Sequence, residues 1–560
     1  MENLKGTFMK IFKRISALAL SLILSLSFLI SCDWVIFIPV DRTSAGLPEY
    51  TLTEEYVEET KSLLKQAENT TLNNKPVVEV NFAWSQFISR YYEIATQANI
   101  AVVLYTIDSG NDYYKKQYLF ANNSYSEIYG LYTDSLKRIY NSPSRELFFN
   151  GWTQDEVDSI LKHDEEVVAL EKHNSELEVE YASLSELEFT DGVVEIYKQI
   201  VANNNKIASK MGYSSYYDYA SKVVYQRDYT PSQLSYFREK VASTILPLAD
   251  NVLNDYKDKL KMLSVSEKSL VSDIKDDPYY ETDTNYWDKY IASFGDSAFK
   301  NIFNHAFENE NVTFATGLNS REMAFTANLP SANKRYCYFG PGYQDVFTVA
   351  HEIGHYSAGL TLGLESVSMD LKETHSQSNE MLLLEFLEDE ISPNVYEALK
   401  GFSVGNILSA IVVASIIDEF EYSVYTLNNE DKLFADYTSE DFDNIMSEVC
   451  EKYGGKDYVD TVFTDINKYW RNVVVEQPVY YISYATSGLA SVNLYVLACQ
   501  NRGEARNAYQ KLITQSDTSL GFVTTLETAG FVNPFTSRAF DSLTDFFDYD
   551  SDILPLESVA

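Results

Sequence analysis

The stretch Thr348–Tyr356, TVAHEIGHY, carries the pattern H-E-x-x-H. It contains no helix breaker except Gly354, so it predicts a helix. His351 and His355 lie one turn apart on one face of that helix, where both rings can bind one metal ion. Glu352 lies beside this face and can take a proton from a metal-bound water. The alternative is a chance pattern on a surface helix, but two of the chain's six histidines fall here in register.

A third metal ligand is expected downstream, because a catalytic zinc site uses three protein ligands and keeps a fourth position open. The candidates are Glu365, Asp370, Glu373, His375 and Glu380. We favour Glu373, because the run 373–383 predicts a second helix on which Gln377 and Glu380 share its face. Glu380 can then orient a ligating histidine; its alternative is a solvated helix charge. His375 points elsewhere on this helix and is the weaker candidate.

These two motifs, H-E-x-G-H followed by E-x-x-S-Q-x-x-E, resemble those of the M3 family of zinc metallopeptidases, the thimet oligopeptidase and oligoendopeptidase F group. By this resemblance His351, His355 and Glu373 bind one zinc ion per chain. Glu352 matches the catalytic base, and Glu380 matches the acid behind the ligand set. Angiotensin-converting-enzyme-like and carboxypeptidase-Taq-like peptidases share the first motif and a similar downstream glutamate, so they are neighbours to exclude.

A tyrosine-rich segment, 477–488 (QPVYYISYATSG), is the third region of chemical interest. Peptide hydrolysis places negative charge on the carbonyl oxygen, and a tyrosine hydroxyl can donate to it. The segment resembles the tyrosine-rich segment of M3 enzymes, with Tyr484 as the best match, Tyr480 the second and Tyr481 the third. Many members carry a histidine just before this segment, whereas here Gln477 sits near that place. The departure leaves Glu352, zinc and tyrosine as the catalytic set.

The rest of the chain reads as mostly helical from Thr53 onward. Two short strands are predicted at 324–329 and 336–339, just before the zinc helix, and Asp345 can cap that helix. An edge strand at this place can pair with an extended substrate backbone; the alternative is a small structural hairpin. The apolar run 407–417 is too short for a membrane span and predicts a buried core helix.

The resemblance extends from about residue 190 to 540 and implies the fold class. It implies a mainly α, zincin-like helical metallopeptidase with two helical halves around a deep channel and a small β-sheet near the zinc helix. We expect an N-terminal helical region at 51–300 and a catalytic zinc-peptidase region at 301–560. The two halves are expected to pack as one body, and the protein is expected to be a monomer.

The N-terminus reads as a targeting segment, residues 1–31, that is not part of the fold. A basic beginning is followed by the apolar run 15–30, which ends in Leu29-Ile30-Ser31-Cys32. This ending resembles a bacterial lipoprotein signal with cleavage before Cys32. Cys32 would then carry lipid, with 32–50 as a tether, and anchor the protein to a membrane outside the cytoplasm. The alternative is a plain signal anchor.

Charge and cysteine content exclude several classes of protein. The net charge is −38, and the first 32 residues contribute +3, so the remainder carries about −41. Such a charge argues against binding to nucleic acid and against electrostatic adhesion to anionic lipid. Only Cys337, Cys450 and Cys499 follow Cys32, so there is no disulfide framework. Cys499 lies in an apolar run and is expected in the core.

Together these features predict a zinc-dependent metalloendopeptidase that cleaves short or unfolded peptides, with Glu352 as general base for a metal-activated water. Tyr484, with Tyr480, is expected to donate to the oxyanion. Two alternatives stay open: a peptide-binding lipoprotein without catalysis, and a carboxypeptidase with the same zinc chemistry. The intact Glu352 argues against pure binding, whereas the missing histidine is the one feature that favours it.

Overall fold

The structure is a computed structural model that describes residues 46–547 except 150, 151, 153, 183, 185–188, 279–284, 296–297, 363–366, 428–431, 476 and 518–519. The predicted signal peptide, Cys32 and the tether up to residue 45 lie outside the described residues. Contacts divide the chain into two compact units. The first comprises 1–184, 199–219 and 305–341, and the second comprises 185–198, 220–304 and 342–560. The predicted halves and the channel between them stay a prediction.

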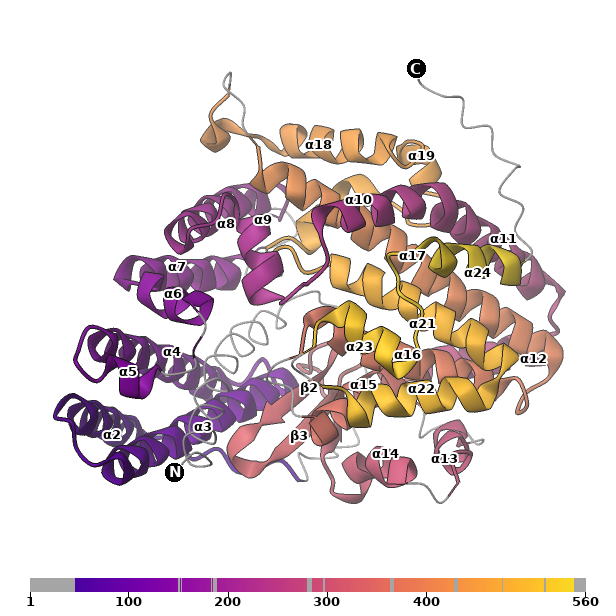
Figure 1. Cartoon of the computed structure of the whole chain (residues 1–560). Helices are drawn as coiled ribbons and strands as arrows, with labels where there is room; N and C mark the ends of the chain where they lie inside the picture. The colour runs from indigo at the N-terminus through magenta and orange to yellow at the C-terminus, as the bar shows by residue number, and fades with distance from the viewer. Residues whose placement is uncertain are drawn as a thin grey trace. The chain divides into compact units, whose positions relative to one another are not determined.

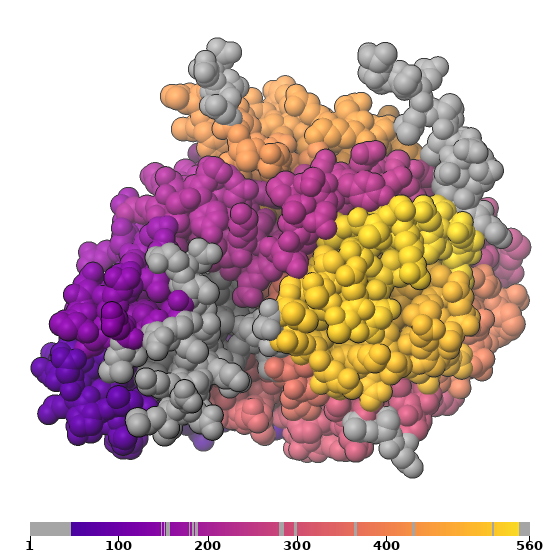
Figure 2. Space-filling view, viewed as in Figure 1, coloured from indigo at the N-terminus to yellow at the C-terminus, as the bar shows by residue number. Residues whose placement is uncertain are grey.

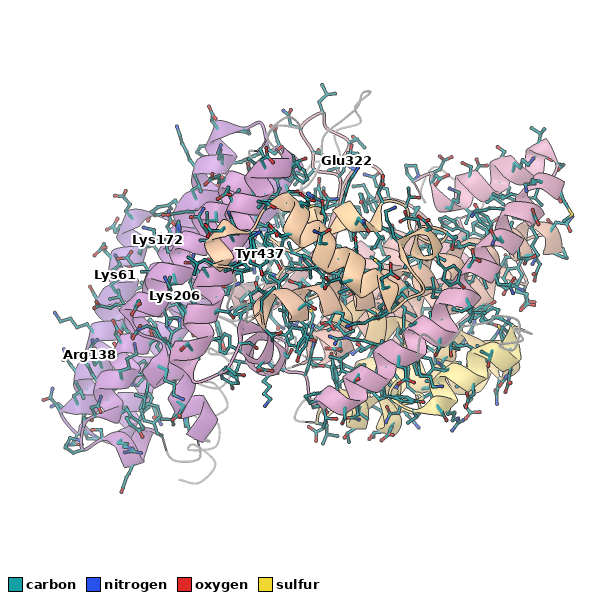
Figure 3. All side chains as sticks on the ribbon, turned by 90° about the horizontal axis from the view of Figure 1, so that it is seen from above. Lys61, Arg138, Lys172, Lys206, Glu322 and Tyr437 are labelled. Carbon is teal, nitrogen blue, oxygen red and sulfur yellow. The ribbon has the colours of Figure 1, made fainter. Side chains whose placement is uncertain are left out.

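The first unit is built mainly from helices (Figure 1). These are α2 (Glu54–Leu72), α3 (Val77–Ile107), α4 (Asp112–Tyr140), α5 (Arg145–Phe148), α6 (Gln154–Lys162), α7 (Glu165–Ala182), the end of α8 (Phe189–Met211) and α9 (Tyr216–Tyr219). Thr53 caps α2 by accepting a hydrogen bond from the backbone N–H of Tyr56. Cations join the surface helices: Arg138 of α4 pairs with Glu68 of α2, and Figure 3 labels this arginine.

The core of this unit is aromatic. Trp84, Phe87 and Tyr91 of α3 are fully buried against Tyr125 and Tyr132 of α4. The ring centroids of Phe87 and Tyr132 lie 5.7 Å apart, and those of Tyr91 and Tyr125 lie 5.3 Å apart. Large rings bury much apolar area per residue, so a few positions hold three helices together.

A three-stranded sheet completes the first unit. It consists of β1 (Val312–Phe314), β2 (Ala324–Leu329) and β3 (Lys334–Phe339), in the order β1-β3-β2. β2 and β3 form an antiparallel hairpin that pairs Ala324 with Phe339, and a short 3₁₀ turn, η4 (Pro330–Ala332), joins them. β1 runs parallel to β3. The predicted strands are confirmed, whereas β1, with only three residues, was missed.

The sheet packs on α3, next to which β2 and β3 lie in Figure 1. Asn99 of α3 donates from its side chain to the carbonyl of Asn328 at 2.6 Å, and the hydroxyl of Tyr338 donates to the carbonyl of Thr106 at 3.2 Å. These contacts attach the hairpin to α3, so it has a structural role. The pairing of a substrate with an edge strand stays a prediction.

The second unit holds the remaining helices. They are η2 (Ala220–Val224), α10 (Pro231–Lys240), η3 (Val241–Ile245), α11 (Leu246–Met262), α12 (Val265–Lys275), α13 (Tyr286–Ala292), α14 (Ala298–Glu308, whose end belongs to the first unit), α15 (Val346–Leu362), α16 (Met369–Leu387), α17 (Pro393–Tyr425), η5 (Phe434–Asp436), α18 (Ser439–Glu451), α19 (Lys456–Val459), α20 (Ile466–Tyr469), η6 (Trp470–Asn472), α21 (Ile482–Gln500), α22 (Arg502–Gln515), α23 (Phe522–Ala529) and α24 (Ser537–Phe546).

Two long apolar helices, α17 and α21, form the centre of this unit and pack against each other and against α16. Both are long and apolar enough to cross a membrane, but 83% of each apolar window is buried inside the protein. The prediction of a buried core helix at 407–417 is therefore confirmed. Figure 2 shows the C-terminal helices, in yellow, as one continuous area of this unit's surface. Cys499, expected in the core, is exposed because it lies in the last turn of α21.

Candidate metal centre

The helix that carries His351 and His355, α15, begins directly after Asp345, as the sequence predicts. The Asp345 carboxylate accepts hydrogen bonds from the backbone N–H groups of Phe347 at 2.9 Å and Thr348 at 3.1 Å. These are donors that the first turn of a helix leaves unpaired. The helix is buried along most of its length, including Val349, Ala350 and Ile353. The cap and the apolar faces together hold the motif in place.

Gly354 of the motif allows α15 to lie unusually close to α16. A Cβ atom at this position would stand 2.6 Å from the carbonyl oxygen of His375 and 2.7 Å from the Cα of Ser376. Both are backbone atoms of α16 and cannot turn away as a side chain can. Asn379 of α16 also donates to the carbonyl of Ala350 at 2.7 Å. The glycine therefore sets the short distance between the histidines and the acidic residues of α16.

Three predicted ligands come together between these helices. His351, His355 and Glu373 each offer one ligand atom, and these atoms all lie within 4.8 Å of one another. The Glu373 Oε2 atom lies 3.7 Å from the His351 Nε2 atom and 3.8 Å from the His355 Nε2 atom. Ligands about 2.0–2.2 Å from one zinc ion stand roughly 3.3–3.6 Å apart at tetrahedral angles. Two imidazoles and a carboxylate at this spacing fit a zinc ion.

Glu380 stands behind the first histidine. Its Oε1 atom lies 2.6 Å from the His351 Nδ1 atom, which leaves Nε2 directed toward Glu373. Burial lowers the pKa of His351, but the hydrogen bond and the charge of Glu380 outweigh it and raise the pKa to about 9. The carboxylates around His351 thus favour a positive charge at this place. This contact is the one expected of an acid that orients a metal-ligating ring.

Glu373 is almost completely buried and receives a hydrogen bond from the Tyr480 hydroxyl on its Oε1 atom. Burial raises the pKa of Glu373, and it raises the pKa of Tyr480 well above its usual value. The other oxygen, Oε2, is the atom nearest both histidines. Tyr480 therefore fixes which carboxylate oxygen faces the cluster, a contact that no spacing in the sequence indicated.

Glu352 and Tyr484 complete the surroundings of the cluster. Glu352 is buried on α15, and its charge acts on both His351 and Tyr484. The Tyr484 ring meets the Tyr480 ring nearly at right angles, with centroids 5.0 Å apart. Unlike Tyr480, Tyr484 is partly exposed. A buried carboxylate on α15 and a partly exposed hydroxyl on α21 thus accompany the three candidate ligands.

The other candidate ligands have different places. His375 is buried, its ring nitrogens have no hydrogen-bond partner within the described part of the chain, and its ring is not in the cluster. Burial, with the charge of Lys372, lowers the pKa of His375 to about 3. Asp370 lies one turn before Glu373 and pairs with Arg227 instead. Glu365 lies outside the described residues.

Sequence reasoning missed the polar groups that support the tyrosine segment. No pattern in the sequence assigns a role to Arg227, yet its guanidinium donates to the Tyr480 carbonyl at 3.1 Å and to the Ser483 hydroxyl at 3.0 Å. Tyr225, two residues before it, donates to the Pro478 carbonyl at 2.8 Å. These partners are about 250 residues apart in the chain, so no local pattern could reveal them.

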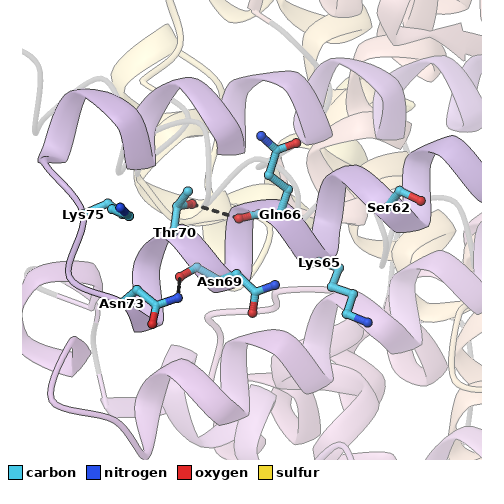
Figure 4. A pocket seen from close by; sticks show the side chains of 7 residues that line it. All are labelled: Ser62, Lys65, Gln66, Asn69, Thr70, Asn73 and Lys75. Carbon is cyan, nitrogen blue, oxygen red and sulfur yellow. Dashed lines mark hydrogen bonds between the residues drawn. The ribbon is translucent and has the colours of Figure 1, made fainter.

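A cavity of about 410 Å³ lies elsewhere, on the first unit (Figure 4). Its lining comes from one face of α2 and the turn after it: Ser62, Lys65, Gln66, Asn69, Thr70, Asn73 and Lys75. Thr70 and Asn73 bond back to carbonyls of their own helix. The cavity contains no acidic, histidine or cysteine side chain that could accompany a metal ion, so we assign no chemistry to it.

Comparison with known proteins identifies the fold. No family model and no curated protein matches the chain. Among solved structures, PZ peptidase A with an inhibitor is similar at TM-score 0.70 and 17% identity, over 90% of this chain and 99% of that one. A protein assigned as an oligoendopeptidase F from Bacillus anthracis gives 0.67 and 16%, over 90% and 98%. Oligoendopeptidase F from Enterococcus faecium gives 0.54 and 14%, over 89% and 98%.

These similarities cover nearly the whole of each chain, and at such identities they concern the fold. The expected fold class, a mainly α, zincin-like metallopeptidase fold with a small β-sheet, is confirmed. The roles of the individual site residues rest on their geometry in this chain.

Proposed function

We propose that this protein is a zinc-dependent metallopeptidase that hydrolyses peptide bonds of short or unfolded peptides. The observation that carries the proposal is the cluster of His351, His355 and Glu373, with Glu352 beside it. The fold shared with solved oligoendopeptidases supports it. A metal site used only for structure has four protein ligands, whereas three ligands and an adjacent buried carboxylate suit catalysis.

The three ligands would hold one zinc ion, which when bound supplies a Lewis acid and lowers the pKa of water toward neutrality, to about 7 in known sites. Glu352 takes the proton of the attacking water and returns it to the leaving amine. Tyr484, which is partly exposed, donates to the carbonyl oxygen as negative charge develops there. Tyr480 holds Glu373 through its hydroxyl and keeps that carboxylate in place.

The test is mass spectrometry of a mixed peptide library incubated with the zinc-loaded protein and, beside it, with Glu352→Gln. We expect internal cleavage by the wild type and a loss of about 10²–10⁴-fold in the variant, because the general base is removed while the ligands stay. Removal of C-terminal residues one or two at a time would identify a carboxypeptidase instead. Zinc binding with no cleavage in either sample would contradict the proposal and favour a peptide-binding protein.

We further propose that Cys32 carries a lipid that anchors a monomeric protein to a bacterial membrane outside the cytoplasm. The support is the basic and apolar N-terminal sequence that ends at Leu29-Ile30-Ser31-Cys32. Cells grown with labelled fatty acid should label the wild type and leave Cys32→Ser unlabelled. Equal labelling of both proteins, or none of either, would contradict the anchor.

A further inference from the structure

The tyrosine segment 477–488, which runs into the first turns of α21, is held by a buried ion pair. Arg227 and Asp370 have side chains that are 1% and 0% exposed, and the Arg227 Nε atom lies 3.4 Å from the Asp370 Oδ2 atom. Asp370 also accepts hydrogen bonds from the hydroxyls of Tyr229, at 3.1 Å, and Thr486. A buried carboxylate needs such a set of partners, because a buried charge without them is strongly destabilising.

The ion pair connects the two sides of the candidate metal centre. Asp370 lies three residues before Glu373 on α16, and Arg227 donates to the carbonyl of Tyr480 at 3.1 Å. The Tyr480 hydroxyl in turn donates to Glu373. Contacts therefore run in a closed ring from Glu373 through both ends of Tyr480 to Arg227, then to Asp370, and back along α16 to Glu373.

The backbone in this ring is strained at a residue that does not favour it. Val479, directly before Tyr480, has φ of +65°, a left-handed conformation that β-branched residues rarely adopt. Its N–H donates at 2.8 Å to the fully buried Glu421 of α17, which holds it there. Such conformations persist where the surroundings impose them, and they gather at functional sites. The strain indicates that the direction of Tyr480 and Tyr484 is imposed.

We propose that Arg227 is a positioning residue for the reaction. Paired with Asp370, it locks the segment 478–484 against the start of α16, so that Tyr480 holds Glu373 and Tyr484 is directed at the reacting carbonyl. The proposal rests on the proposed peptidase function. If Arg227 contributed to stability alone, its replacement would have no specific effect on Tyr480 and Tyr484. A positioning role predicts such a local effect.

The test compares Arg227→Lys with a matched control, Arg471→Lys. Like Arg227, which lies 4.5 Å from the Tyr225 ring centroid, Arg471 is buried and lies over an aromatic ring (Trp470, 4.6 Å). It also pairs with an aspartate, Asp443, at 2.8 Å. Lysine keeps the charge but loses the fork that binds several acceptors at once. Any general loss of stability that follows from replacing a buried arginine therefore appears in both variants.

The first readout needs no activity. Hydrogen–deuterium exchange of the zinc-loaded full chain should be about tenfold faster in peptides covering 478–486 of Arg227→Lys, and unchanged there in Arg471→Lys, since local opening follows the loss of local contacts. Tyr229→Phe removes one partner of Asp370 with little risk to folding and should give a smaller change at the same peptides. Unchanged exchange at 478–486 in both Arg227→Lys and Tyr229→Phe would overturn the proposal.

The second readout is steady-state kinetics on one cleaved peptide, with zinc content measured in parallel. We expect Arg227→Lys to lower kcat about tenfold with KM within about twofold, because the tyrosines act in the transition state. In a Tyr480→Phe background the same change should have much less effect. Independent, multiplying effects of the two changes would overturn the proposal, because Arg227 would then not act through Tyr480. An inactive wild type with faster exchange at 478–486 in Arg227→Lys would instead refute the peptidase function and leave the contact ring intact.

Discussion

Helix α16 and the helices α2–α4 each bury part of their surface, but they do so with different kinds of side chain. In α2–α4 the largest buried side chains are rings such as Trp84, Phe87 and Tyr132. In α16 every residue from Glu373 to Asn379 is polar and buried. Burying polar groups costs free energy unless each finds a partner. Under the proposed function, the aromatic core of α2–α4 serves stability, whereas the buried polar run of α16 serves the metal centre.

The partners of the polar run show how that cost is limited. Ser487 donates to Gln377 at 2.7 Å, Ser378 and Ser491 lie 3.0 Å apart, and Tyr290 donates to Asn379 at 2.7 Å. These partners come from other helices, so α16 is locked in place on several sides. A rigid helix is what a metal ligand such as Glu373 requires. The predictions that follow test this division between a functional and a stabilising core.

Tyr484→Phe should give the largest of these effects. Removing one donor to the developing oxyanion costs roughly 10²–10³-fold in kcat in comparable sites. Phenylalanine keeps the ring of Tyr484 and its packing, and it removes only the hydroxyl. Steady-state kinetics with one peptide, beside Tyr481→Phe as control, measures this. Equal losses in the two variants would remove Tyr484 from the proposed mechanism.

Glu380→Gln should weaken zinc binding about 10–100-fold, because substitutions of groups that orient metal-ligating histidines have effects of this size. The amide still reaches His351 but no longer stabilises its ring by charge. A competition titration with a chromophoric chelator gives the affinity. An affinity equal to the wild type's would show that Glu380 is a structural partner of His351 only.

Gly354→Ala should lower both stability and metal affinity. The added Cβ meets backbone atoms of α16 at 2.6 and 2.7 Å, so the helices must separate, at a cost of about 1–3 kcal/mol. Gly503→Ala is the control, because its Cβ on α22 meets only the Asn501 side chain, at 3.7 Å. Thermal unfolding and zinc titration of both variants check this. Unchanged zinc affinity in Gly354→Ala would mean that the close approach of α15 and α16 does not set the ligand spacing.

Trp84→Phe should affect stability alone. Trp84 is fully buried and its ring nitrogen donates to the Thr71 hydroxyl at 2.8 Å, so the smaller ring leaves a cavity and costs about 1–3 kcal/mol. We expect a lower Tm in calorimetry, with kcat/KM and zinc affinity unchanged at a temperature where the variant is folded. A large fall in kcat/KM of the folded variant would contradict the view that the core of α2–α4 serves stability alone.

Features of the site that depend on neighbouring residues could be predicted from the sequence, whereas contacts between distant residues could not. Asp345 as cap, the helix with His351 and His355, and the hairpin of β2 and β3 all follow from patterns within a few residues. The pairing of Arg227 with Asp370 joins positions far apart in the chain, and neither has a local signature. Val479 has a conformation that only its surroundings impose, so its type predicted the opposite.

The most direct test of the central claim is the zinc content of Glu373→Gln beside Glu385→Gln. Both are buried glutamates of α16, but Glu385 pairs with Arg502 and lies outside the candidate ligand set. After dialysis against zinc-limited buffer, we predict one zinc ion per chain in the wild type and in Glu385→Gln, and a large loss in Glu373→Gln. Full zinc occupancy in Glu373→Gln, or an equal loss in both variants, would contradict the assignment of His351, His355 and Glu373 as the metal site.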